Sequence, residues 1–481
     1  MGIAEALAKR GHHVTMVSPF EPFKKLDNVR EILIENYDVN DHLKGAFEGK
    51  HSIMSLFTST PKMCIDGLGQ QKIQDLKKEK FDLIILNVFF DYCYLSFVHH
   101  FQIPFIYASS GALHGPLHDL VGNIDFPSLS GNVILEPGFP LTFSQRLVST
   151  LINSVFKLMA TYYLEPKMYS DCIKAGLCPK DMPSFSEINK NASLAIINSV
   201  RTLELPPRPA MPNVIYAGGA HIKAPKKLPK DLEEWVQGSG EEGFIFFSLG
   251  SALNPDYLPE EWRQILVKVF GTLKQRVLWK WNKETMPDLP KNVKLQKWLP
   301  QPDLLGHPKI RLFITHGGQM STIESSHHGV PVIGMSVFAD QHFNMKVVQN
   351  EGWGRLVDWK TLEETSFRNV IQDVLNNKTM KEIAKRKSAI MQDRLVPPDE
   401  EAAYWVEYVM RHKGAPHIMS PVRLMYEIYN IDIWAFIIFV LVLVVSILVF
   451  ITKFVLKRCF GFGRSKIDKK KREANKLNYN Y

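Results

Sequence analysis

The sequence lacks the features of several large functional classes. It has only five cysteines in 481 residues, Cys64, Cys93, Cys172, Cys178 and Cys459, and their spacings match no metal-binding motif. So few cysteines do not define a disulfide framework either. No strand-like run is followed by Gly-x-Gly-x-x-Gly, which makes a dinucleotide-dependent oxidoreductase a poor interpretation.

Net positive charge is nearly absent from the body of the chain. The whole chain carries +9, but residues 453–481 hold ten Lys or Arg and two acidic residues, which leaves about +1 for the preceding 452 residues. This balance argues against nucleic acid as a partner of the body. The apolar content of 45% is ordinary for a globular protein, and the length is sufficient for two domains and further segments.

One apolar run, Trp434–Ile451, has eighteen residues and no charge, just enough to cross a bilayer as a helix. Lys453, Lys457 and Arg458 follow it. The positive-inside rule then places the tail, residues 453–481, in the cytoplasm and the body across the membrane. We predict a single-pass protein with a juxtamembrane segment over 416–433 and a transmembrane helix over 434–452.

A body across the membrane requires a signal sequence, and residues 1–10 (MGIAEALAKR) lack the apolar core of one. They are typical of the end of an amphipathic helix, so we expect the N-terminus of this sequence to be incomplete. Glycosylation sequons begin at Asn191 and Asn377 and fit a lumenal body, although such triplets are common by chance.

The most informative stretch is Arg311–Gln341. Leu312–Thr315 is typical of a buried parallel strand, Gly317-Gly318 ends it, and Met320–His328 is predicted to be a short helix. A second strand is expected at Val330–Gly334. The N–H groups and the dipole at the start of such a helix favour a phosphate.

Polar residues surround this predicted phosphate site. His316 precedes the glycine pair, and Glu324 follows His316 by just over two helical turns, where its carboxylate can accept hydrogen bonds from ribose hydroxyls. Asp340 and Gln341 follow the next strand, at the edge of the sheet where α/β folds bind ligands.

The ordered set His316-Gly317-Gly318, Ser321, Glu324, Pro331 and Asp340-Gln341 resembles the signature of the UDP-glycosyltransferases, which include the UDP-glucuronosyltransferases of animal endoplasmic reticulum. The resemblance extends, more loosely, from about Lys9 to the C-terminal apolar run. It implies the α/β fold called GT-B, in which two doubly wound, Rossmann-like domains face a cleft. The implied boundaries are an acceptor-binding domain over 1–205, a linker over 206–213 and a UDP-sugar-binding domain over 214–415.

The resemblance also implies the residues that bind the donor. Trp298 stacks on uracil with Gln301 nearby, Glu324 holds the ribose, and Asp340 with Gln341 binds sugar hydroxyls. The residues implied for the diphosphate are Ser251, His316, Gly317, Gly318 and Ser321, in a preorganised electrostatic role. Met320 departs from the family, since many relatives have Asn there. No Asp-x-Asp occurs in the chain, and neither a metal nor a cofactor is implied beyond the UDP-sugar as co-substrate.

The acceptor side departs further from the family pattern. Its catalytic base is a histidine on the loop after the first strand, which would lie upstream of Met1, and His12 and His13 begin the second strand instead. Asn87 stands where the family has the aspartate that orients this histidine, with Asp91 as an alternative. Asn can hold an imidazole by a hydrogen bond but does not stabilise its cation as a carboxylate does.

The expected activity is inverting transfer of glucose or glucuronic acid, from UDP-glucose or UDP-glucuronic acid, to a hydroxyl of a small lipophilic acceptor. The expected location is the endoplasmic reticulum membrane, with a lumenal body and a cytoplasmic tail, and a homo- or hetero-oligomer is possible. The alternative is a catalytically silent, membrane-anchored UDP-sugar-binding partner of active relatives, a hypothesis that rests on Asn87 and on the absence of the base loop from this sequence.

Overall fold

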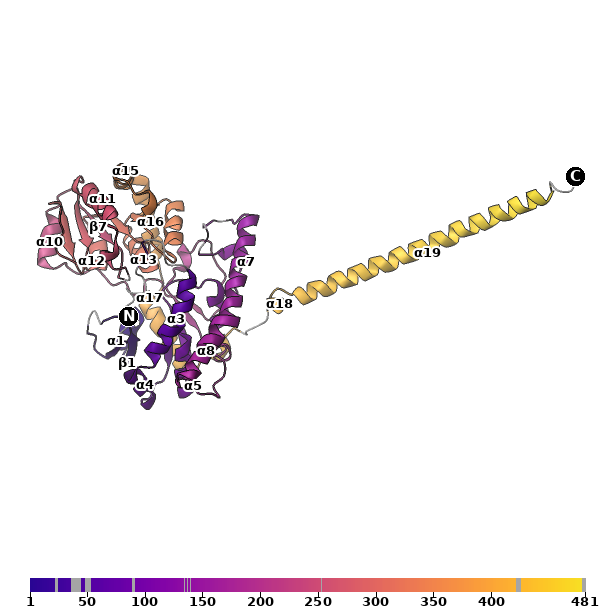
Figure 1. Ribbon diagram of the computed structural model, residues 1–481, viewed down its shortest axis with the longest axis horizontal. Helices are drawn as coiled ribbons and strands as arrows, with labels where there is room; N and C mark the ends of the chain where they lie inside the picture. The colour runs from indigo at the N-terminus through magenta and orange to yellow at the C-terminus, as the bar shows by residue number, and fades with distance from the viewer. Residues whose placement is uncertain are drawn as a thin grey trace. The chain divides into compact units, whose positions relative to one another are not determined.

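The computed structural model describes residues 1–21, 25–35, 45–47, 53–88, 91–133, 135, 137–138, 140–251, 253–420 and 425–477. The chain divides into two compact units, residues 1–420 and 421–481. The first unit contains the parallel β-sheets, and the second contains a long helix (Figure 1). We call the two parts of the first unit the N-terminal lobe and the C-terminal lobe, each built around its own parallel sheet.

The C-terminal lobe is built on a six-stranded parallel sheet with the order β12-β11-β10-β7-β8-β9. Its strands are β7 (Phe244–Ser248), β8 (Arg276–Lys280), β9 (Val293–Gln296), β10 (Ile310–Thr315), β11 (Val332–Gly334) and β12 (Gly354–Leu356). The chain runs outward from β7 to β9 and then returns to the other side of β7. The topological switch point therefore lies between β7 and β10, where open α/β sheets bind ligands beside the strands' carboxyl ends.

Helices cover both faces of this sheet, which explains the unbroken apolar run of β7, whose five residues are all buried. One face packs against α11 (Glu260–Gly271) and α15 (Glu364–Asn376). The other packs against α10 (Lys230–Gln237), α12 (Gln301–Leu305), α14 (Gln341–Asn350) and α16 (Lys378–Gln392). The helix predicted after β10 is α13 (Gln319–His328).

The N-terminal lobe has a four-stranded parallel sheet of β3 (Ile84–Asn87), β4 (Phe105–Ser109), β5 (Ala195–Ile197) and β6 (Val214–Tyr216), in that order. A separate parallel pair joins β1 (Val14–Ser18) to β2 (Val29–Leu33). The sequence boundary placed Val214 at the start of the second domain, but β6 is hydrogen-bonded to β5. That strand therefore belongs to the first sheet.

The main helices of this lobe are α1 (Gly2–Lys9), α3 (Ile53–Leu68), α5 (Leu95–Phe101), α7 (Phe143–Met159), α8 (Glu165–Lys174) and α9 (Phe185–Asn189). Two disulfides cross-link parts of this lobe, and the sequence did not define them. Cys64 of α3 is bonded to Cys93, just before α5, and Cys172 of α8 is bonded to Cys178. All four sulfurs are therefore oxidised, which fits a non-reducing compartment.

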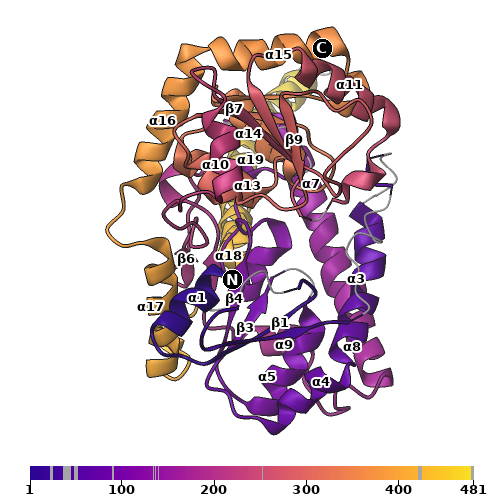
Figure 2. The ribbon, with the colours of Figure 1, turned by 90° about the vertical axis from the view of Figure 1, so that its left-hand side faces the viewer.

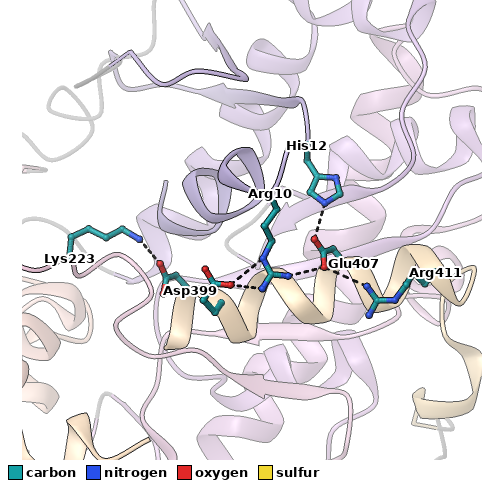
Figure 3. Close-up of polar contacts among 7 residues, drawn as sticks. Arg10, His12, Lys223, Asp399, Glu407 and Arg411 are labelled. Atoms are coloured by element: carbon teal, nitrogen blue, oxygen red, sulfur yellow. Dashed lines mark hydrogen bonds and ion pairs between the residues drawn. The ribbon is translucent and has the colours of Figure 1, made fainter. Parts of the chain in front are cut away.

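Helix α17 (Pro398–Arg411) follows the C-terminal lobe in sequence but packs on the N-terminal lobe (Figure 2). Its alanines and valines pack against α1, β4, β5 and β6. Figure 3 shows the polar contacts of the same helix: Arg10 Nη1 donates to Glu407 Oε2 at 2.8 Å, His12 Nε2 lies 3.1 Å from Glu407 Oε1, and Lys223 Nζ lies 2.6 Å from Asp399 Oδ2. The helix fastens the end of the C-terminal lobe to the first lobe.

The second unit consists of the short helix α18 (Met425–Ile428) and the long helix α19 (Ile431–Leu477). Within α19, Ile431–Arg458 is long and apolar enough to cross a membrane. The run predicted from the sequence, residues 434–452, lies inside this segment, and the helix continues into the basic tail.

Candidate functional site

His316 lies at the carboxyl end of β10 against two glycines. A Cβ at Gly250, whose φ is +81°, would lie 2.6 Å from His316 Cε1, and a Cβ at Gly318 would lie 2.5 Å from His316 Nε2. Only glycine lets both backbone segments approach the ring so closely. Burial, aided by the charge of Lys280, lowers the pKa of His316 to about 4, so the imidazole is neutral at neutral pH.

The start of α13 lies beside the His316 ring. Gly318 is the N-cap residue, and as a glycine it supplies no side-chain cap to the N–H groups of the first turn. These donors and the positive end of the helix dipole suit an anion. Gly317 holds the preceding turn at a φ of +85°, and Ser321 is buried in the first turn of the helix.

Lys280, at the end of β8, faces the turn after β7 that contains Gly250 and Ser251. This lysine was not predicted from the sequence. Its Nζ donates to Gly250 O at 2.9 Å, lies 3.4 Å from Ser251 Oγ and sits 4.8 Å from the centre of the Trp298 ring. Burial lowers the pKa of Lys280. Its place at the carboxyl end of the strand next to β7 is the one sequence signal that could have identified it. The indole of Trp298 is 49% exposed beside this cation.

A second group of contacts surrounds Glu324, which is 7% exposed. Gln301 Nε2 donates to Glu324 Oε2 at 2.7 Å and to Ser321 Oγ at 3.1 Å. On the other side, His221 Nε2 lies 3.2 Å from Glu324 Oε1. The structure thus joins three residues predicted for the site and adds His221. That residue follows β6 in the chain, and no local pattern marked it.

Asp340 and Gln341 stand at the start of α14, next to Gly317. Asn344 Nδ2 donates to Asp340 Oδ2 at 2.7 Å and to Gly317 O at 3.1 Å, so it fixes the carboxylate beside the glycine turn. Burial raises the pKa of Asp340, and the bond from Asn344 opposes this. The Gln341 Oε1 accepts the backbone N–H groups of Val337 and Phe338, at 2.9 and 3.1 Å. Gln341 thus shapes the loop that precedes α14.

The two acceptor-side candidates lie at the end of β3 and after it. Asn87 is the last residue of β3 and is exposed, and Asp91 is the N-cap residue of the turn Tyr92–Tyr94. Burial raises the pKa of Asp91 to about 7, so its carboxyl group titrates near neutral pH.

A cavity of about 130 Å³ lies between the two lobes. His114 and Arg208 of the N-terminal lobe and Gln319 and Phe343 of the C-terminal lobe are among its lining residues. Arg208 Nη1 lies 3.1 Å from His114 Nδ1, and burial lowers the pKa of this histidine well below its usual value. The first residue of α13 thus borders both the anion-binding turn and an inter-lobe cavity. Within the described ranges no group of three or more His, Cys, Asp or Glu is arranged to hold a metal ion.

Two α/β lobes, each built on its own parallel sheet, with a glycine turn at the switch point of the second, are the arrangement of the GT-B class of glycosyltransferases. Solved structures agree on the fold. The calicheamicin glycosyltransferase CalG4 superposes with a TM-score of 0.59 over 86% of this chain and 94% of that chain, at 17% identity.

The chain belongs to the family described as "UDP-glucoronosyl and UDP-glucosyl transferase", whose model matches residues 3–466. It is 34% identical to UDP-glycosyltransferase UGT5 of Dactylopius coccus, over 94% of this chain and 88% of that protein. It is 31% identical to UDP-glucuronosyltransferase 1A8 of Rattus norvegicus, over 97% of this chain and 91% of that protein. The family and the GT-B fold expected from the signature are therefore confirmed. The protein is a UDP-glycosyltransferase, an enzyme that uses a UDP-sugar donor.

Proposed function

We propose that this protein transfers glucose or glucuronic acid from its UDP-sugar to a hydroxyl group of a small lipophilic acceptor, with inversion at the anomeric carbon. The observation that carries this proposal is the continuous polar rim at the switch point. It runs from Lys280 and Trp298, past His316 and the start of α13, to Gln301 and Glu324.

In this proposal each part of the rim binds one part of the donor. Uracil stacks on Trp298, and the ribose hydroxyls donate to Glu324, which Gln301 and His221 orient. The diphosphate lies against Ser251, Gly317 and Gly318, the N–H groups of α13, Ser321 and the neutral His316. Asp340 and Gln341, at the start of α14, are assigned to the sugar hydroxyls.

Charge develops on the leaving UDP as the glycosidic bond breaks, and preorganised donors stabilise it without rearrangement. Lys280 adds a cation here, because its Nζ already lies within 3.4 Å of Ser251 Oγ. On the acceptor side a base must remove the hydroxyl proton while the oxygen attacks the opposite face of the sugar. We assign Asp91, with Asn87 four residues before it, to orient or support that base, since the Asp91 pKa of about 7 suits proton transfer near neutral pH.

We further propose that α19 anchors the enzyme in the endoplasmic reticulum membrane, with the body in the lumen and the basic tail in the cytoplasm. The length of the apolar segment Ile431–Arg458 and the basic residues after it support this topology. The four body cysteines, all in disulfides, agree with an oxidising lumen.

Donor binding and turnover, measured side by side, test the proposed function. Full-length protein in vesicles is titrated with UDP by calorimetry and then incubated with radiolabelled UDP-glucose or UDP-glucuronic acid and a panel of phenols and sterols. Trp298→Ala should abolish UDP binding and product formation together. UDP binding without product from any donor would support the silent UDP-sugar-binding alternative, and unchanged binding by Trp298→Ala would refute the assigned donor site.

A further inference from the structure

Helix α7 buries polar side chains and exposes several of its large apolar ones, the reverse of a surface helix of a globular protein. The buried residues of α7 are Ser149 and Asn153. Asn153 Oδ1 accepts a hydrogen bond from Asn132, and its Nδ2 donates to Gly131 O at 3.4 Å. The inward face is thus held to the lobe by polar contacts.

The outward face carries a stripe of large apolar side chains at helical spacing. We call it the α7 stripe, and it consists of Leu147, Leu151, Val155 and Leu158 of α7 and Tyr162 of the π-helical turn that follows (Ala160–Leu164), with exposed fractions of 48, 57, 60, 56 and 76%. Phe143 and Val148, 73 and 41% exposed, widen it. A contiguous stripe of this kind on one surface helix indicates an interaction site.

The same segment, Phe143–Lys174, is long and apolar enough to cross a membrane by length and composition. Its packing shows that it does not do so. Met168 and Cys172 are buried in the core of the lobe, and Cys172 is bonded to Cys178. Together with the buried Asn153, these contacts keep the whole length of the segment against the folded lobe, with only one face outward.

The length of the chain between Ser420 and α19 limits how far this lobe can lie from α19. Ser420, the last residue of the first unit, lies against Gly122, since a Cβ there would stand 3.0 Å from Ser420 O. The segment just before Gly122 is tied to α7 by an ion pair of Asp119 Oδ2 with Lys157 Nζ at 2.8 Å. The ten residues from 421 to 430 then lead to Ile431, and they span at most about 35 Å when fully extended.

The charges of α7 are compatible with an anionic membrane surface. The helix carries two cations, Arg146 and Lys157, and no carboxylate, so nothing on it repels anionic headgroups. Amphipathic helices of this composition lie in the plane of the membrane interface with the apolar face among the acyl chains.

We propose that α7 is an interfacial helix whose stripe inserts into the leaflet of the membrane that α19 spans. This inference rests on the proposed role of α19 as an anchor. Membrane contact along α7 holds the body on the bilayer surface, where lipophilic acceptors concentrate. It also removes from water the apolar side chains that the fold leaves exposed.

The test uses the full chain with a protease site inserted between Ser420 and Met425, reconstituted into vesicles of phosphatidylcholine and phosphatidylserine. Extraction at alkaline pH first checks the anchor: a chain that is extracted refutes the proposed membrane span itself. A chain that resists extraction is then cleaved, and the released body is separated from the vesicles by flotation.

Three versions are compared: the unsubstituted chain, Leu151→Glu with Val155→Glu in the stripe, and Leu395→Glu with Val396→Glu, a matched pair at exposed positions between α16 and α17. We expect the unsubstituted chain and the matched pair to float with the vesicles after cleavage and the stripe variant to be released at least 10-fold more. UDP affinity, equal in all three, shows that each is folded.

Two results would overturn the proposal. Release of the unsubstituted body on cleavage, as a monomer or as a dimer, would show that the stripe faces water or a second copy of the chain. Retention of all three bodies on the vesicles would show that another surface of the body binds the membrane.

Discussion

Replacing Glu324 with alanine tests the donor site at its most constrained residue. A carboxylate has about four positions that accept hydrogen bonds. Gln301 Nε2 occupies one of them at 2.7 Å, and His221 Nε2 lies 3.2 Å from Oε1 without donating a hydrogen bond, which leaves room for the two ribose hydroxyls. Each bond to a charged acceptor contributes about 1.5–3 kcal/mol, and because such terms are not additive we expect a combined loss of about 3 kcal/mol. The dissociation constant of UDP should therefore rise about 100-fold.

The assay is calorimetric titration of the full-length protein with UDP. Glu324→Gln, which keeps one acceptor oxygen and the side-chain volume, should fall between the unsubstituted protein and Glu324→Ala. Glu260→Ala is the matched control, since it removes a carboxylate from α11 of the same lobe, where Glu260 pairs with Arg263, and should leave UDP affinity unchanged. If Glu324→Ala is folded and binds UDP within a factor of two of the unsubstituted protein, the ribose assignment is wrong.

Three further predictions concern the rim and the buried histidines. Lys280→Met should weaken binding of UDP about 10-fold but hardly change binding of uridine, and equal losses in the two titrations would contradict a diphosphate role. Gly250→Ala should lower kcat/KM at least about 10-fold by displacing His316, whereas Gly240→Ala, also at positive φ but with nothing within 4 Å of its Cβ, should only lower the Tm. Burial lowers the pKa of His118 to about 4, so the unfolded state takes up a proton first, and the Tm should fall as pH drops from about 6.5 toward 4. His118→Gln should flatten that dependence, and an unchanged pH profile would refute it.

Local sequence predicted much of the C-terminal lobe because its signals are short-range. The apolar run of β10, the glycine pair after it and the helix that Gly329 ends all lie within about twenty residues. Each element is decided by its own residues, since a strand covered on both faces needs a continuous apolar run and a left-handed helix end needs glycine. The same holds for the apolar part of α19.

Contacts between distant residues were set by tertiary structure instead. The sequence pattern did not pair Cys64 with Cys93, bring His221 to Glu324 or place Lys280 against Gly250. These pairs come together only when strands that are far apart in the chain become neighbours in a sheet, so no spacing in the sequence reports them.

The sequence by itself determined the family and the apolar segment of α19, because these depend on the order of residues within short segments. Only the tertiary structure decided that β6 joins the first sheet, that α17 packs back onto the first lobe and that α7 turns its apolar face outward. The physical reason is that hydrophobic pattern fixes which face of an element is apolar, whereas the neighbours available in the fold fix whether that face is covered.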